Sequence, residues 1–165
     1  MRPWELRPQE EAALINPAFT SLMVAGCAGG YASAGHDSMP LSLVYLALPV
    51  LLHGPTRRAL PFSVRTSLPA WLTENAEMRV GFGARVRALR SHAREGVLVG
   101  TRHGLLEMGG DGGILSALPE TVHGRCVRRL SGDAAECLRR SWFLGKWFGM
   151  AGTPATVFAL WGIRP

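Results

Sequence analysis

The densest group of side chains able to bind a charged ligand lies between residues 79 and 102, where six arginines accompany a single acid, Glu95. Guanidinium groups bind phosphates and carboxylates through paired hydrogen bonds. We therefore expect this stretch to contact double-stranded DNA or a protein partner. Phosphate contact is favoured over base readout, because the stretch offers no Asn or Gln to read adenine. The candidate contact residues are Arg85, Arg87, Arg90, Arg94 and Arg102.

Other residue types that perform chemistry are present without the required spacing. His123 and Cys126 could supply two metal ligands, but no second pair completes a site, so the histidines are interpreted as scattered core or surface residues. Gly81-Phe-Gly83 lacks the third glycine of a dinucleotide loop. No Gly-x-Ser-x-Gly, His-Glu-x-x-His or close carboxylate pair occurs. We predict no catalytic residue, no metal, no cofactor and a protein that is not an enzyme.

The third group is aromatic and fills residues 141–165, which hold three of the five tryptophans and the only lysine, Lys146. Aromatic surface of this size is buried either in the protein's own core or against a partner. The core is the simpler interpretation. The alternative is a partner interface, where Trp and Arg anchors concentrate. Its candidate residues are Trp142, Trp147, Trp161 and Arg164.

Charge is unevenly distributed over the 165 residues. Residues 1–75 are neutral, and the whole net charge of +6 lies in residues 76–165. Such asymmetry suits a polyanion or an acidic protein partner, although a biased coding sequence would also produce it. The length predicts one domain over residues 1–165.

Cysteine usage and hydropathy place the protein in the cytoplasm, away from membranes. The three cysteines have no CxxC spacing, which favours free thiols in a reducing compartment. The first residues lack the apolar run of a signal peptide. The longest apolar stretch, Leu41 to Leu52, is interrupted by Pro49 and reaches about half the length of a membrane span.

The hydrophobic pattern predicts a mainly α fold with a small β-hairpin. Asn16 and Pro17 begin a helix to about Ser33, and its glycines, Gly26, Gly29 and Gly30, either weaken it or let another element approach closely. The arginines at 57, 58 and 65 could cap helix ends or contact a partner, but solvated surface is the favoured interpretation. Expected helices cover residues 9–15, 17–33, 39–53, 69–74, 77–92, 93–103, 131–148 and 154–160, with a strand as the alternative for the last.

The order of elements in residues 77–118 is helix, helix, hairpin, with strands at 105–108 and 114–117. This order predicts a winged-helix-like module embedded in a helical domain. It separates a helical part, residues 1–75, from a C-terminal helical aromatic block, residues 131–165. Residues 54–69 are expected to be irregular and residues 119–130 to be loop. Asp133 is the expected cap of the helix that begins near residue 131.

Several short motifs occur in a fixed order along the chain. The motifs are Asn16-Pro-Ala-Phe19, Leu48-Pro-Val-Leu-Leu-His53, Pro55-Thr-Arg57, Thr66-Ser-Leu68, Trp71-Leu-Thr-Glu-Asn75, Arg79-Val-Gly-Phe82, Phe143-Leu-Gly-Lys-Trp-Phe148 and Gly152-Thr-Pro-Ala-Thr-Val-Phe-Ala-Leu-Trp-Gly-Ile-Arg-Pro165. In this order they resemble a known family, the middle components of bacterial three-component ABC (ATPase) conflict or defence systems. The resemblance covers nearly the whole chain, and the final block is its most specific part.

This resemblance implies a non-enzymatic adaptor that links an ABC-type ATPase to an effector protein of the same operon, in systems directed against phage or plasmids. It carries over no catalytic residue. Residues 116–137 and the glycines from Gly26 to Gly30 depart from the family's pattern. The alternative function is a stand-alone winged-helix DNA-binding regulator.

Overall fold

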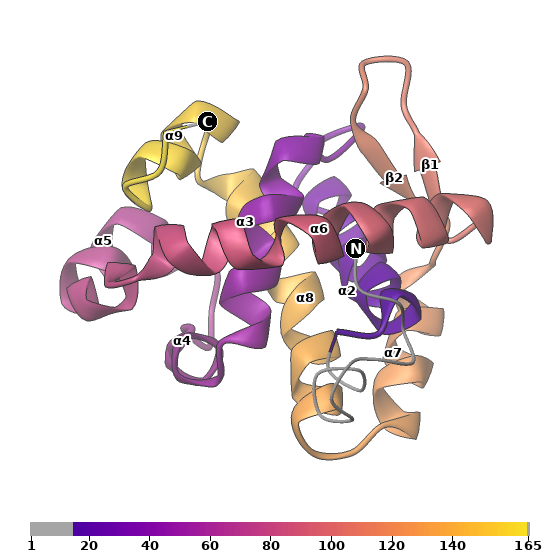
Figure 1. Cartoon of the computed structure of the whole chain (residues 1–165), viewed down its shortest axis with the longest axis horizontal. Coiled ribbons are helices and arrows are strands. Elements are labelled where there is room, and N and C mark those ends of the chain that lie inside the picture. Colours follow the sequence, from indigo (N-terminus) through magenta and orange to yellow (C-terminus); the bar gives the residue numbers. More distant parts are fainter. Residues whose placement is uncertain (1–14, 165) are drawn as a thin grey trace.

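A computed structural model of the chain describes residues 15–164 as a set of helices around a hydrophobic core, with a two-stranded hairpin projecting from one end (Figure 1). The mainly helical fold with a small hairpin is as the sequence predicts. In chain order the elements are α2 (Pro17–Ala32), α3 (Leu41–Leu52), α4 (Gly54–Ala59), α5 (Leu68–Glu74), η2 (Ala76–Arg79), α6 (Phe82–Arg102), β1 (Leu106–Met108), β2 (Ile114–Ser116), α7 (Glu120–Arg129), α8 (Gly132–Met150) and α9 (Pro154–Leu160).

The helix starts follow local sequence signals. Asn16 Oδ1 accepts a hydrogen bond from the Ala18 amide at 2.9 Å, and Pro17 occupies the first turn of α2. Thr153 caps α9 in the same way by accepting from the Thr156 amide at 3.2 Å. The expected helix over residues 154–160 is therefore confirmed, and the alternative strand is wrong.

The hairpin pairs Leu106 with Ser116 and Met108 with Ile114 in antiparallel register. Its second strand also bridges to Met39, just before α3, through two backbone hydrogen bonds of 2.7 and 2.8 Å. Ser38 Oγ donates to Asp111 in the turn at 2.6 Å. The hairpin is thus tied to the start of α3.

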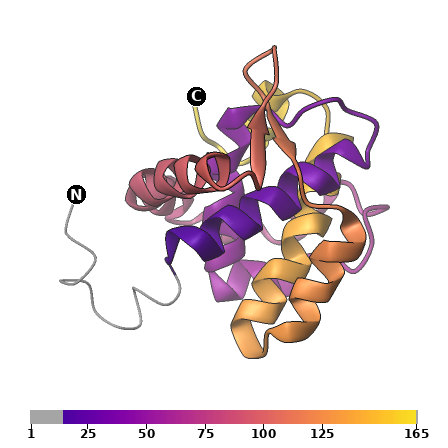
Figure 2. The ribbon, with the colours of Figure 1, turned by 90° about the vertical axis from the view of Figure 1, so that its right-hand side faces the viewer.

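The closest helix contact joins α2 to α8, and glycines make it possible. A Cβ atom at Gly30 would collide with the Trp142 carbonyl, and one at Gly145 would collide with the Cys27 carbonyl. At Gly29 it would lie 2.5 Å from the Trp142 ring. The glycines of α2 therefore serve close approach, the second of the two roles that the sequence leaves open. Figure 2 shows α2 crossing beside the α7–α8 pair.

An aromatic cluster fills the other end of the core. The Phe82 and Trp161 rings stack with centroids 4.2 Å apart, and Trp71 meets Trp147 edge to face at 5.5 Å. Trp147 Nε1 donates to the Thr66 carbonyl at 2.6 Å, which satisfies its polar edge. Residues from α5, α6, α8 and the turn after α9 are held together in this way.

One helix, α6, replaces the two that the sequence predicts over residues 77–92 and 93–103. Its C-terminal half contains Gly96 and Gly100, which pack against Thr20 and Ser21 of α2, so burial offsets the low helix propensity of glycine. The α6 helix runs unbroken across the molecule (Figure 1). The winged-helix-like arrangement, which needs a turn between two helices, is not confirmed.

Three further expectations are wrong. Residues 120–129 form α7 and not a loop, with an acid in the first turn and arginines in the last, as the helix dipole favours. Residues 54–59 form the short helix α4. Asp133 makes no capping hydrogen bond; Ser131 occupies the N-cap position of α8. The expected helix over residues 9–15 lies almost entirely outside the described residues.

The most apolar helix, α3, is central, as its sequence predicts, and eight of its residues are buried. It ends where His53 and Gly54 lead into α4. None of the helices within residues 15–164 combines the length and the apolarity needed to cross a membrane.

We predict that Gly145→Ala destabilises the protein by about 3 kcal/mol, because the new methyl group must push α2 and α8 apart. Chemical denaturation followed by circular dichroism measures this change. The matched control is Gly124→Ala in α7, whose Cβ would meet only an ordinary contact at 3.6 Å. This control should stabilise by up to about 1 kcal/mol. Equal effects of the two substitutions would contradict the proposed role of Gly145.

Candidate functional site

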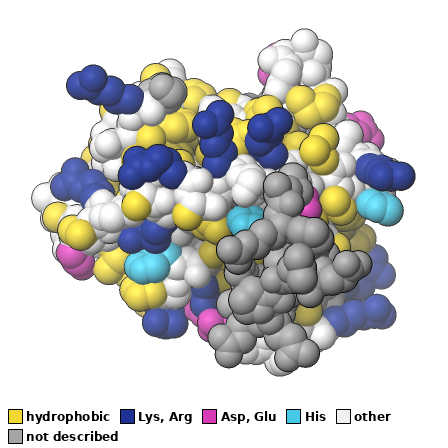
Figure 3. All heavy atoms as spheres, viewed as in Figure 1, with side chains coloured by type: hydrophobic (Ala, Val, Ile, Leu, Met, Phe, Trp, Pro, Cys, Tyr) yellow, Lys and Arg dark blue, Asp and Glu magenta, His cyan; other side chains and the backbone are white. Residues whose placement is uncertain are grey.

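Four of the five candidate contact arginines lie exposed on α6. The positions of Arg87, Arg90, Arg94 and Arg102 fall within about 120° of one another around the helix axis and span about 22 Å along it. Figure 3 shows basic side chains gathered along the face that α6 crosses. We call these four residues the arginine row.

Arg85, the fifth candidate, is used inside the fold. Its guanidinium donates to the Met78 and Val80 carbonyls at 2.8 and 2.9 Å and lies 5.5 Å from the Phe82 ring centroid. Burial lowers the pKa of Arg85. This side chain holds the turn before α6 and is half-buried, so it differs from the arginine row.

A groove of about 470 Å³ opens where α3, α6 and the segment around α9 meet. Its walls combine apolar side chains with three arginines, and no carboxylate is among its described lining residues. We call it the arginine groove; it is lined by Ser42, Tyr45, Gly83, Val86, Arg87, Arg90, Phe158, Ile163 and Arg164.

This groove brings together residues from two candidate sites that lie far apart in the sequence. Arg87 and Arg90 come from the predicted DNA or partner contact, and Arg164 from the predicted partner interface. Both ion pairs within residues 15–164 involve Arg57 and neither involves a groove arginine. Three cations therefore surround one groove whose described lining residues include no carboxylate.

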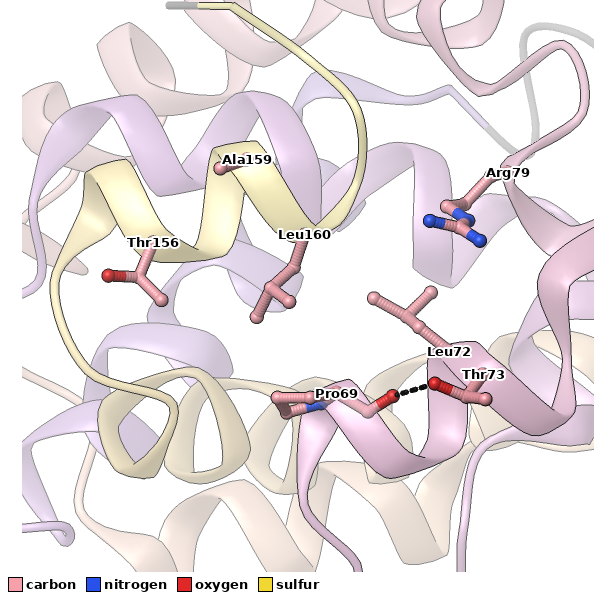
Figure 4. Close-up of a pocket in the computed structure, with 7 residues that line it drawn as sticks. All are labelled: Pro69, Leu72, Thr73, Arg79, Thr156, Ala159 and Leu160. Carbon is pink, nitrogen blue, oxygen red and sulfur yellow. Dashed lines mark hydrogen bonds between the residues drawn. The ribbon is translucent and has the colours of Figure 1, made fainter.

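A second groove, of about 350 Å³, lies on the other side of α9 (Figure 4). Leu72 of α5 and Leu160 of α9 point into it, with Arg79 at its far side. Thr73 Oγ1 donates to the Pro69 carbonyl at 2.9 Å, so its polar atom is already satisfied within α5. We call this the α5–α9 groove. It is mainly apolar and carries one cation.

The candidate interface residues of the aromatic block are divided between core and surface. Trp147 and Trp161 are each 1% exposed and belong to the core, so they offer no surface to a partner in this state. Trp142 is half-buried, beside Gly29 and with its ring centroid 5.3 Å from that of His123. Arg164 is exposed. For the two core tryptophans the simpler interpretation holds.

Arg57, expected on the solvated surface, is 2% exposed. Its Nη1 donates to the Leu51 carbonyl at 2.6 Å and its Nε to Glu136 at 3.3 Å. Its Nη2 lies 3.0 Å from Asp133 Oδ1, close enough for an ion pair but without hydrogen-bond geometry. The neighbouring Arg58 is exposed, as expected. The interpretation as solvated surface is therefore wrong for Arg57 but not for Arg58.

The reason for this burial lies in the backbone of α3. The Leu51 carbonyl would normally receive the amide of residue 55, but Pro55 has no N–H. Arg57 and the Cys137 thiol, at 3.4 Å, both donate to this carbonyl instead. Burial raises the pKa of Cys137 to about 11, so it stays a thiol at neutral pH. The signal in the sequence is Pro55, because a proline four residues after Leu51 leaves that carbonyl in need of a side-chain donor.

His123 and Cys126, the two candidate metal ligands, both lie on α7. His123 is buried, and its Nε2 lies 3.3 Å from Ser141 Oγ. The Ser141 hydroxyl donates to the Leu138 carbonyl at 2.7 Å, which leaves its oxygen to accept from His123. Within residues 15–164, no group of three or more His, Cys, Asp or Glu side chains is placed to hold a metal ion.

A family model described as "ABC-three component (ABC-3C) system Middle Component 3" matches residues 4–165. No curated protein and no solved structure matches.

We predict that Arg57→Ala lowers the free energy of unfolding by about 3 kcal/mol, because it leaves the Leu51 carbonyl with only the weak Cys137 thiol donor and creates a cavity. Arg58→Ala, at the exposed adjacent position, should change it by less than about 0.5 kcal/mol. Urea denaturation of the two variants measures both values. Similar values would show that Arg57 is not a core residue.

We predict that stability falls as the pH falls below about 6.5, the ordinary histidine pKa. Burial lowers the pKa of His123, an effect larger than the opposing ones of Leu138 and Glu120. Below this pH the unfolded state therefore binds more protons than the folded state. Thermal denaturation at several pH values should show a shallower loss for His123→Gln than for the wild type. His103→Gln, at an exposed position, is the control and should keep the wild-type slope.

Proposed function

Because the chain belongs to the family of ABC-three component (ABC-3C) system Middle Component 3, we propose that it is a non-enzymatic adaptor that links an ABC-type ATPase to an effector protein. The observation that carries this proposal is the family match over residues 4–165. The setting we propose is a bacterial conflict system directed against phage or plasmids. An ATPase partner works where ATP is present, so we place the adaptor in the cytoplasm.

An adaptor needs two separate surfaces, and the segment around α9 contributes to two grooves. Phe158 lines the arginine groove, whereas Thr156, Ala159 and Leu160 line the α5–α9 groove. The two grooves differ in chemistry, since one carries three arginines and the other one. Different chemistry on two sides of one helix supports binding of two different proteins.

The predicted interface residues take different roles in this proposal. Arg87 and Arg90 of the arginine row contact a partner directly together with Arg164, and the half-buried Trp142 lies beside Gly29 of α2. Trp147 and Trp161 act from the core, where their rings hold α5, α8 and the C-terminal turn in place. Deleting residues 141–165 would therefore remove part of the core, and surface substitutions are the better tool.

A second candidate is a stand-alone DNA-binding regulator. The observation in its favour is the arginine row, whose length of about 22 Å matches several phosphates along a duplex. Binding of this kind weakens steeply with salt because counterions are released. Fluorescence anisotropy with a labelled duplex at low and physiological salt tests this candidate.

We predict that the ATPase and the effector of the same operon form one complex only when this chain is co-expressed with them. Affinity purification through a tag on the ATPase, followed by size-exclusion chromatography, measures the composition of the complex. The control omits this chain and should leave the effector unbound. Capture of the effector by the ATPase alone, or no binding of this chain to either protein, would refute the adaptor.

A further inference from the structure

We infer that the arginine groove is the docking site for an acidic segment of a partner protein, in which carboxylates flank one large apolar side chain. This inference rests on the proposed adaptor function and names the chemistry of one of its partners.

The rim of the groove requires negative charge. Arg87 and Arg90 lie three residues apart on one face of α6, and Arg164 lines the groove from the C-terminal side. None of the three takes part in either ion pair within residues 15–164. Their mutual repulsion is relieved when carboxylates bind, and a guanidinium can hold a carboxylate through two parallel hydrogen bonds.

The floor of the groove requires an apolar group. Val86 of α6, Tyr45 of α3 and Phe158 of α9 line it together with Ile163. Ile163 lies close over α6, because a Cβ at Gly83 would be only 3.3 Å from Ile163 Cδ1. An apolar side chain that enters this space contacts all three elements. Buried apolar anchors surrounded by charged contacts are typical of the strongest positions in protein interfaces.

Duplex DNA fits the groove less well. Phosphates can reach the rim, but a duplex backbone offers no apolar group to cover Val86 and Phe158. The row also continues beyond the groove, since Arg94 and Arg102 do not line it. A duplex would contact the whole arginine row, whereas a short acidic segment in the groove would contact only Arg87 and Arg90 of that row. This difference separates the two ligands experimentally.

The test compares two charge-reversed variants of α6 in co-purification with the ATPase and the effector. The groove variant is Arg87→Glu with Arg90→Glu, and the matched control is Arg94→Glu with Arg102→Glu, which changes the net charge equally. A third variant, Ser42→Trp, fills the groove and leaves every arginine in place. Circular dichroism and thermal denaturation confirm that each variant is folded.

We predict that the groove variant binds one of the two proteins about 100-fold more weakly, because two charge-assisted hydrogen-bonded pairs are lost. Ser42→Trp should weaken binding of the same protein by about tenfold or more. The matched control should bind both proteins like the wild type. Overlapping peptides from the affected partner, tested by fluorescence anisotropy, should identify a binder with carboxylates beside a large apolar residue.

Other results overturn the inference in recognisable ways. If all variants keep both partners while the wild type bridges them, the groove is not the docking site and the adaptor function stands. If the wild type binds neither protein, the proposed function fails and the inference fails with it. If both charge-reversed variants lose salt-sensitive duplex binding equally and Ser42→Trp does not, the row binds DNA and the peptide site is refuted.

Discussion

The close approach of α2 and α8 is the contact on which the rest of the architecture depends. Glycines on both helices replace side chains with backbone at the crossing, so that Gly30 meets the Trp142 carbonyl and Gly145 meets that of Cys27. Along its length α2 also packs against α6, through Gly96 and Gly100. One apolar helix is therefore enclosed by two others at short distance, and the position of α6 follows from this packing.

The α8 helix transmits this constraint to the opposite end of the molecule. Asp133 and Glu136 in its first turns contact Arg57, and Cys137 donates to the Leu51 carbonyl in the last turn of α3. Further along, Trp147 joins the aromatic cluster that positions the turn after α9. The walls of the arginine groove come from α3, α6 and this C-terminal turn. The shape of the arginine groove is therefore determined by buried contacts.

Much of the helical framework follows from local signals, whereas the candidate site does not. The caps at Asn16 and Thr153 are readable because they involve neighbouring residues. The sequence does not predict α7, because Pro119 and Gly124 are typical of a loop. The acid in its first turn and the arginines in its last turn are weaker signals of a helix. The continuity of α6 depends on packing against α2, and the meeting of Arg164 with Arg87 depends on the whole fold. No local pattern contains such information.

The separation in sequence between α2 and α8 has a consequence for how the chain acquires its structure. Roughly a hundred residues separate α2 from α8 in the sequence. Bringing the two helices together therefore closes a long loop, and the chain entropy lost in doing so is compensated only when they pack. Until α8 docks, the glycine-lined face of α2 that it covers remains exposed. Folding of this chain is thus governed by a nonlocal step, and its slow phase should track α8 docking rather than helix formation.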